Sequence, residues 1–304
     1  MAVVPLNLEV PTSSNASTSG RNHHHNQRQG ECHTESITFG EKGSETGQFN
    51  LPFGATVSDE GEIFIADCWN QRIQVFTLQG MFVRQFTTSK QNLVPHDVAV
   101  DGEGNLWVVG RSGLTELAVQ YHKHGNELRK IDLGNSGWWR GVAVDTRRNC
   151  ILITQTTTGD RGSPHGKVLL FRADGTCIQA VDRRQMLENP IYIAVDTKGN
   201  ILVSDCEKHC VFVYSEDRQF QFKFGDEGSG EGQLCLPCGI CTDRAGNIIV
   251  ADSGNKCVEM FDKTGKFLKH VTTDKRGPRA VAMATQGQLI VTFWNHTVSI
   301  LQNY

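Results

Sequence analysis

The stretch PIYIAVDTKGNILVSD at residues 190–205 contains the pattern from which the fold can be predicted. It joins two runs rich in apolar and β-branched residues through the polar sequence DTKGN, which is typical of two antiparallel strands connected by a tight turn. Five other stretches have the same pattern, and they begin at Pro52, Pro95, Trp139, Pro237 and Pro278. Successive units start 41–51 residues apart, which is close to the length of one blade of a β-propeller.

Two more β-rich runs follow each of these hairpins. In the fourth unit they are Val211 to Tyr214 and Phe220 to Phe224, again separated by short turns. Helical periodicity is essentially absent from the body of the chain. Four antiparallel strands in each of six units predict an all-β fold, a six-bladed β-propeller.

The last unit contains only three strands before the chain ends. The missing strand is available near residue 37, because ITFGEKGSETGQF at 37–49 matches FKFGDEGSGEGQL at 222–234. We therefore expect the N-terminal strand to complete the last blade and close the ring, which removes open sheet edges. The propeller then spans residues 37–304.

Residues 1–36 form a separate part of the chain. They are polar and lack periodicity, and they carry too little apolar surface to offset the entropy of ordering, so we expect a disordered tail. Its three consecutive histidines, His23 to His25, fit a low-complexity linker better than a metal site.

The composition of the 304 residues fits a folded body, since 38% are hydrophobic, 21% are charged and 31 are glycine. These values exclude a wholly disordered chain and a small scaffold held together by disulfides. The net charge of −3 excludes a uniformly basic nucleic-acid binder, although one face can still be basic. Ten cysteines, without a recognisable secretory signal or a membrane-length apolar run, predict a reduced, cytoplasmic protein with no membrane contact.

Several segments resemble NHL repeats. They are IADCWNQRIQVFTLQGMFVRQF at 65–86, VSDCEKHCVFVYSEDRQFQFKFG at 203–225 and VADSGNKCVEMFDKTGKFLKHV at 250–271, with the flanking sequences FGEKGSETGQFNLPFGATV and FGDEGSGEGQLCLPCGICTD. The resemblance covers residues 37–304 and is clearest in the first, fourth and fifth units. The order and number of units are similar to the C-terminal propeller of the Brat-like tripartite-motif NHL proteins.

This resemblance implies a recognition module. Members of the family bind RNA or protein partners through the propeller, and many carry a RING ubiquitin-ligase head. The chain shows no RING, B-box or coiled-coil pattern, so we expect no ligase activity of its own.

One face of the predicted propeller gathers the candidate binding residues. In a propeller, the loops that precede the first strand of each blade and those that join its second and third strands open on the same face. The residues that we select there for binding RNA or a partner are Phe53, Trp69, Arg72, His96, Arg111, Trp139, Arg140, Tyr192, Lys208, His209, Asn255, Lys256, Arg279, Trp294, Asn295 and His296.

These residue types favour single-stranded or hairpin RNA, which predicts a role in post-transcriptional regulation. Basic groups attract phosphates, aromatic rings stack on exposed bases, and Asn and Arg read base edges. Recognition of a protein is the alternative, for example of a substrate or partner of a ubiquitin-ligase-type protein, because Trp and Arg are equally typical of protein interfaces. A structural role also stays open for Arg72, Lys208, His209 and Lys256, which follow the aspartates Asp67, Asp205 and Asp252.

A metal-dependent propeller enzyme is disfavoured. Calcium needs converging oxygen ligands in the channel and zinc needs several histidines, whereas the expected mouth positions are Phe53, His96, Arg140, Ile191, Cys238 and Arg279. The CxxCxxC spacing of Cys235, Cys238 and Cys241 lacks a fourth ligand and fits core packing. We therefore expect no catalytic activity, no metal site, no cofactor and no small-molecule substrate.

Overall fold

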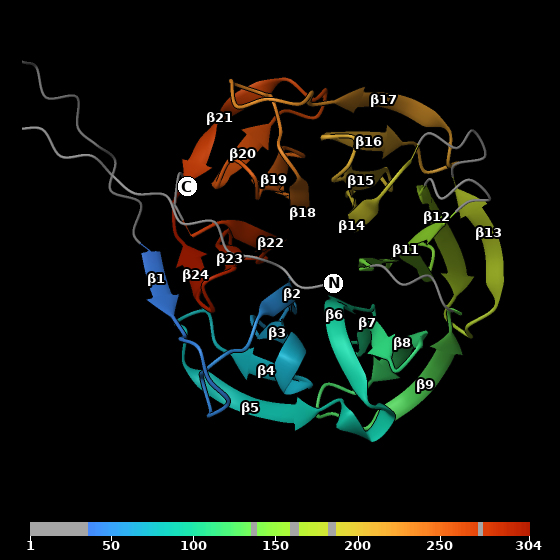
Figure 1. Cartoon of the computed structure of the whole chain (residues 1–304), viewed down its shortest axis with the longest axis vertical. Helices are drawn as coiled ribbons and strands as arrows, with labels where there is room; N and C mark the ends of the chain where they lie inside the picture. Colours follow the sequence, from blue (N-terminus) through green and yellow to red (C-terminus); the bar gives the residue numbers. More distant parts are fainter. Residues whose placement is uncertain (1–35, 135–138, 159–163, 182–186, 273–275) are drawn as a thin grey trace, which may run out of the picture. The chain divides into compact units, whose positions relative to one another are not determined.

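Six four-stranded antiparallel sheets surround a central channel (Figure 1). The structure is a computed structural model that describes residues 36–134, 139–158, 164–181, 187–272 and 276–304. Within these residues, 24 strands and two short 3-10 helices account for the regular structure. The predicted all-β six-bladed propeller is confirmed. No helix in the described ranges has the length and apolar character needed to cross a bilayer.

The first three blades follow one another along the chain. Blade 1 contains β2 (Pro52–Val57), β3 (Ile63–Asp67), β4 (Arg72–Phe76) and β5 (Phe82–Thr87). Blade 2 contains β6 (Leu93–Val100), β7 (Leu106–Ser112), β8 (Thr115–Tyr121) and β9 (Glu127–Asp132). Blade 3 contains β10 (Val142–Asp145), β11 (Cys150–Thr158), β12 (Pro164–Arg172) and β13 (Cys177–Val181). The helices η1 (Cys68–Asn70) and η2 (Ser89–Gln91) lie in loops of this half.

The second half repeats the arrangement. Blade 4 contains β14 (Pro190–Val195), β15 (Ile201–Asp205), β16 (Cys210–Tyr214) and β17 (Phe220–Phe224), blade 5 contains β18 (Pro237–Thr242), β19 (Ile248–Asp252), β20 (Cys257–Phe261) and β21 (Phe267–Thr272), and blade 6 contains β22 (Pro278–Met283), β23 (Leu289–Phe293) and β24 (Val298–Leu301).

Blade 6 takes its outer strand from the other end of the propeller. β1 (Ser36–Phe39) lies antiparallel to β24, with Ser36 opposite Leu301. The Phe39 ring also lies 4.7 Å from the ring of Phe76 in blade 1. The strand begins one residue before the expected boundary at residue 37, and the tail, including His23 to His25, lies outside the described residues.

The core lies between neighbouring blades. The second and third strands of a blade are buried on both faces, as in β3 and β4, where every residue is buried. The outer strand β5 is mostly exposed or half-buried. One cluster joins Phe64 and Ile73 of blade 1 to Val98 and Val108 of blade 2, so that packing between blades fixes where their loops lie.

Aspartate shapes the turn between the first and second strands. Asp196 Oδ1 accepts hydrogen bonds from the backbone N–H groups of Lys198 and Asn200, at 2.8 Å each. Gly199 has φ of +85°, a conformation that glycine adopts without steric cost. The DTKGN sequence therefore forms the tight turn expected from it.

Candidate functional site

An aromatic cluster with a central guanidinium occupies the mouth of the channel. The Cζ atom of Arg279 lies 3.0 Å from the ring centre of Phe53 and 3.8 Å from that of Trp294. Trp139 stacks on Phe53 with ring centres 4.4 Å apart. The loop order along the chain thus brings together residues of blades 1, 3 and 6, as the repeat pattern predicted. Such contacts between a cation and ring faces are attractive, more so when they are desolvated.

Arg279 is nevertheless an interior residue, with 4% of its surface exposed. Its Nε and Nη1 atoms have no hydrogen-bond partner among the described residues. Burial lowers the pKa of Arg279 from its ordinary value, although the guanidinium stays charged at neutral pH because its pKa starts above 12. The cation is held by rings rather than by a carboxylate.

His96 and Tyr192 are also buried, which corrects their expected place on an open face. Burial and the positive charges of Arg279 and Arg140 lower the pKa of His96 to about 3, so the imidazole is neutral at physiological pH. It lies edge-on to Trp139 at 4.5 Å. Tyr192 is 5% exposed and lines the channel interior. Neither side chain adds charge for a nucleic-acid ligand.

Arg140 corrects the prediction of a free cation at the mouth. It is buried and forms an ion pair with Glu116 of β8, and it donates to the carbonyl oxygens of Thr154 at 3.2 Å and Leu133 at 3.3 Å. Sequence reasoning missed Glu116, although an acidic residue inside the apolar run TELAVQY was a visible signal. The pair is part of the framework between blades 2 and 3.

Arg72 is a second correction. Its Nε donates to Asp67 Oδ2 at 2.7 Å, and its other nitrogens donate to the carbonyls of Ser44, Glu45 and Gln48 and to Gln85 Oε1. With its donors occupied and 8% of its surface exposed, Arg72 cannot reach a ligand. Its role is to fix the segment that precedes β2, which is the structural role left open above.

Among the described residues, Asp205 binds the backbone N–H of Lys208 at 3.3 Å but does not pair with its ammonium group. Lys208 Nζ instead lies 2.6 Å from Glu188 Oε2. His209 and His296 are corrections as well, because each accepts a backbone N–H on Nδ1, from Leu236 at 3.1 Å and from Leu51 at 3.0 Å. These two histidines link the blade 4 and blade 6 loops to the start of the next blade.

The amides of this face are also occupied in part. Asn255 Nδ2 donates to Asp252 Oδ2 at 2.6 Å and to the Gly228 carbonyl at 2.7 Å. Asn295 Oδ1 accepts from Thr297 Oγ1 at 2.8 Å, although Asn295 itself is exposed. Asn255 therefore holds its loop, whereas Asn295 is available to a ligand.

Four large apolar side chains are exposed in the connections of the loop face. Trp69 is 61% exposed and Trp294 is 45% exposed, and two residues missed by the sequence analysis, Leu114 and Leu236, are 74% and 44% exposed. Trp294 is held in place by a hydrogen bond from its Nε1 to Ser253 Oγ at 3.0 Å. An apolar residue at the tip of a loop, as in RSGLTE at 111–116, was the signal available for Leu114. We call these four side chains the loop-face patch.

Two cations accompany the loop-face patch. Arg111 and Lys256 are exposed, and within the described ranges neither forms an ion pair. Arg111 Nε donates to the Gly113 carbonyl at 2.9 Å, which orients its guanidinium along the loop. The same connections also expose the carboxylates Glu41, Glu45, Glu207, Asp226, Glu227 and Glu231, so the face combines apolar side chains with charges of both signs.

Below the mouth, the channel holds a cavity of about 250 Å³. Asp97 lines it and is buried, and its Oδ2 accepts the Val142 N–H at 2.9 Å. Burial raises the pKa of Asp97 to about 7, against the effect of its backbone hydrogen bonds. The sequence analysis missed this residue, although Asp97 stands where other inner strands have glycine, alanine or tyrosine.

Comparison with known proteins identifies the repeats. A family model described as "NHL repeat" matches residues 49–76, 187–214 and 234–261, which belong to blades 1, 4 and 5, the three that fit best from sequence. The chain is 35% identical to Protein brain tumor of Drosophila melanogaster over 120 residues, which are 38% of this chain and 12% of that protein.

Two further relatives are similar over longer stretches. B-box type zinc finger protein ncl-1 of Caenorhabditis elegans is 33% identical over 155 residues, 49% of this chain and 17% of that protein. The human E3 ubiquitin-protein ligase TRIM32 is 26% identical over 180 residues, 59% of this chain and 21% of that protein. The alignments therefore span only about an eighth to a fifth of these relatives.

Solved structures agree with the fold. A gluconolactonase from Xanthomonas campestris superposes with a TM-score of 0.64 at 17% identity, covering 84% of this chain and 86% of that one. Virginiamycin B lyase from Staphylococcus aureus gives 0.63 at 11% identity, covering 90% and 100%. At such low identity the likeness shows a shared propeller fold and nothing about activity.

Proposed function

We propose that the chain is a binding module and that its loop face binds a protein partner. The chain is a six-bladed propeller that carries NHL repeats and is homologous to brain tumor, ncl-1 and TRIM32. The single observation that carries this proposal is the loop-face patch, the exposed side chains of Trp69, Leu114, Leu236 and Trp294, in connections that also carry the exposed cations Arg111 and Lys256. Large apolar and aromatic anchors beside Arg or Lys are typical of protein interfaces.

The chemistry of this face describes the partner. Its exposed anchors need apolar side chains opposite them, and Arg111 and Lys256 are complementary to carboxylates. We expect a segment that combines apolar and acidic residues. The homology to an E3 ubiquitin-protein ligase makes substrate or partner selection within a larger protein a consistent setting, and a cytoplasmic location fits it.

RNA is the second candidate, and one observation favours it. The exposed side chains of Trp69 and Trp294 can stack on bases, and Arg279, which lies beside Trp294, has buried Nε and Nη1 donors without partners among the described residues. Against it, carboxylates neutralise three of the six Arg and Lys residues on which the RNA prediction rested, namely Arg72, Arg140 and Lys208. Binding driven by phosphate contacts needs that charge to be available.

We expect no catalytic role for the propeller itself. The enzymes among the similar structures share only the fold. At the mouth of this chain, the guanidinium of Arg279 lies over Phe53, where its charge would repel a catalytic cation. Assay of the purified chain for lactonase and lyase activity tests this, and turnover that tracks protein concentration would contradict it.

The proposed partner recognition is tested by recovering bound proteins from cells with the tagged chain, with and without ribonuclease. The double variant Trp69→Ala with Trp294→Ala should lose the bound proteins by roughly 10-fold or more, because hot-spot aromatics are worth about 2 kcal/mol or more. Wild-type recovery should survive ribonuclease.

The matched control is Met81→Ala, because Met81 is 65% exposed but lies in the turn between the third and fourth strands of blade 1, on the opposite face. It should bind like the wild type. Loss of the bound proteins after ribonuclease, together with binding of short RNA pools that weakens steeply with salt, would reject the protein proposal in favour of RNA.

A further inference from the structure

In blade 1, the guanidinium of Arg72 occupies a buried position that is surrounded by oxygen atoms. The guanidinium of Arg72 sits between Asp67 at 2.7 Å and Gln85 Oε1 at 3.0 Å. Gln74 lies beside it and donates to the same Asp67 oxygen at 3.1 Å. Three backbone carbonyls complete the surroundings. Oxygen ligands on all sides therefore suit a positive charge at this point of the blade.

Blade 5 keeps the position but changes its chemistry. By strand register, the places of Asp67, Arg72, Gln74 and Gln85 are taken by Asp252, Cys257, Glu259 and His270. The arginine is lost, and a neutral amide becomes a carboxylate. Asp252 lies close enough to Glu259 for the two carboxylates to repel each other. The blade has gained negative charge and lost the cation that balanced it.

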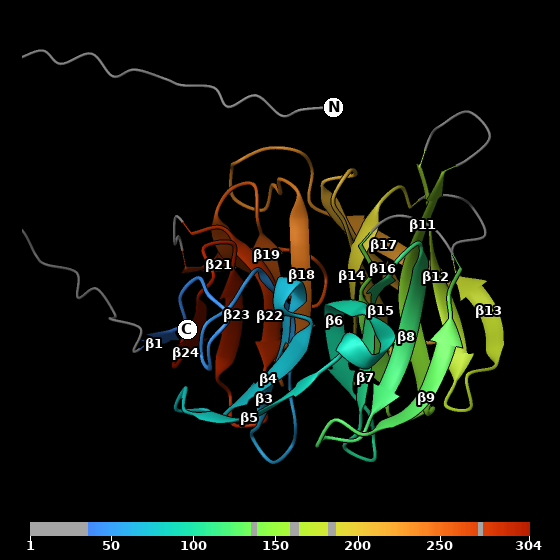
Figure 2. The same cartoon turned by 60° about the horizontal axis from the view of Figure 1, so that its bottom comes forward.

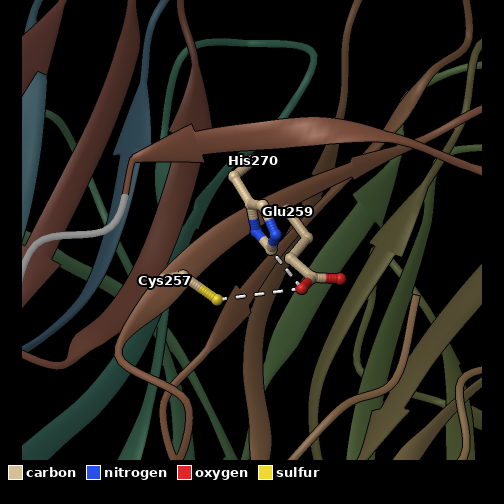
Figure 3. A group of neighbouring side chains, drawn as sticks. All are labelled: Cys257, Glu259 and His270. Carbon is tan, nitrogen blue, oxygen red and sulfur yellow. Dashed lines mark hydrogen bonds and ion pairs between the residues drawn. The ribbon is translucent and has the colours of Figure 1, made fainter. Parts of the chain in front are cut away.

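The three new side chains converge on one another (Figure 3). Glu259 Oε1 lies 3.8 Å from Cys257 Sγ and 3.5 Å from His270 Nδ1, and the ligand atoms of all three lie within 4.8 Å of one another. Glu259 is 1% exposed, and its second oxygen, Oε2, is buried without a hydrogen-bond partner in the described part of the chain.

The distances from Glu259 Oε1 to Cys257 Sγ and to His270 Nδ1 are close to those between the ligands of a zinc ion. Tetrahedral zinc with bonds of about 2.3 Å to sulfur and about 2.0–2.2 Å to nitrogen and oxygen places its ligand atoms roughly 3.3–3.7 Å apart. A thiolate, a carboxylate and an imidazole are all zinc ligands. Thiolate and carboxylate together balance the two positive charges, and binding releases the Cys257 thiol proton to solvent. Because the His270 side chain is 40% exposed, solvent can supply the fourth ligand.

We propose that Cys257, Glu259 and His270 form a zinc site that joins β20 to β21 in blade 5. No metal site was expected from the sequence, because the three residues lie on two strands and match no Cys-x-x-Cys or His-x-x-x-His spacing. The ion replaces the guanidinium that holds the same position in blade 1, and it ties the outer strand of the blade to its neighbour. The proposal is independent of the loop-face patch.

Blade 4 provides the internal control. It also has a buried cysteine, Cys210, five residues after its aspartate, but the two other register positions hold Phe212 and Lys223. An apolar ring and an ammonium group do not bind zinc. Cys210→Ser therefore removes a buried thiol at the same place in a blade without touching the proposed site.

The test is titration of the full-length chain with zinc against a chromophoric chelator, and with cobalt(II) followed by absorption. The chain should carry His23→Ala, His24→Ala and His25→Ala throughout, so that the tail histidines do not contribute. We expect one equivalent of tightly bound metal and, for cobalt, the near-ultraviolet absorption of a thiolate ligand. Cys210→Ser should be unchanged.

Cys257→Ser should weaken binding by more than about 100-fold, since residues that merely orient ligands are already worth about 10–100-fold. His270→Gln is a second variant, for use if Cys257→Ser folds poorly, because His270 is partly exposed and its replacement disturbs the core less. We expect it to lose the same metal affinity. Any one of three results would overturn the proposal. They are the absence of one tightly bound equivalent of metal in the parent chain, equal metal affinity of His270→Gln and the parent, and bound cobalt without thiolate absorption.

Discussion

At the scale of single residues, the site depends on whether a charge is buried with a partner, buried among rings or left in water. Arg72 and Arg140 are paired with carboxylates, Arg279 lies among aromatic rings, and Arg111 is in solvent. The same residue type thus has three different roles in one protein. Only the solvent-exposed cation can contribute to steering a charged partner.

The pair formed by Arg140 and Glu116 gives the first prediction. Replacing Arg140 by Leu removes the guanidinium that neutralises the buried carboxylate of Glu116, so the free energy of unfolding should fall by about 3–5 kcal/mol. The double variant Arg140→Leu with Glu116→Leu should be more stable than that single variant, because no charge is left unpaired. Urea unfolding measures both. Equal stability of the single variant and the wild type would contradict a structural role.

Asp97 gives a prediction about pH. Its pKa in the folded chain is about 7, raised by burial from an ordinary 3.8. The folded state therefore favours the neutral acid, and the stability it contributes is complete below pH 3.8 and is lost as pH rises through 7. Asp97→Asn should stabilise the protein relative to wild type at pH 8, by an amount on the order of a few kcal/mol, and much less at pH 5.

Chemical unfolding of wild type and Asp97→Asn at both pH values checks this. Asparagine retains the acceptor for the Val142 N–H, so the comparison isolates the charge. A difference in stability between the two proteins that stays the same from pH 5 to pH 8 would show that Asp97 is ionised in the fold at no cost.

These residues show that the sequence predicts which side chains meet at the site but does not predict which of them are buried. Which loops share a face depends only on the repeat order, so the meeting of Phe53, Trp139, Arg279 and Trp294 was predictable. Burial was not, because it depends on partners far away in the chain. Glu116 lies 24 residues from Arg140, on the third strand of the preceding blade, and a local pattern does not reveal that pairing.

At the scale of strands, the ring is joined by β1 and β24. Four residue pairs connect the two strands, and Thr38 Oγ1 lies 2.7 Å from Ser299 Oγ across them. The N-terminal strand was predictable because residues 37–49 repeat residues 222–234 almost position by position.

Truncation tests the contribution of this strand. A chain that begins at residue 40 lacks β1 and exposes the edge of β24, so it should unfold at a lower temperature and aggregate. A chain that begins at residue 36 is the matched control and should behave like the full-length protein. Thermal unfolding followed by circular dichroism and light scattering measures both properties, and identical behaviour of the two truncated chains would contradict the role of β1.

At the scale of the whole molecule, the propeller places loops from distant parts of the sequence on one face. Figure 2 shows the blades from the side, with their strands running between the two faces of the ring. Trp69 of blade 1, Leu114 of blade 2, Leu236 at the start of blade 5 and Trp294 of blade 6 all belong to connections on one of these faces. Neighbouring blades thereby build a surface larger than any one loop provides.

The most direct test of this account is to place a photoreactive amino acid at Leu114 on the loop face, and in a second chain at Met81 on the opposite face. Irradiation in cells followed by mass spectrometry identifies what lies against each position. We expect a discrete protein to be crosslinked at Leu114 and to be absent at Met81. Crosslinks to RNA at Leu114, or the same proteins at both positions, would contradict it.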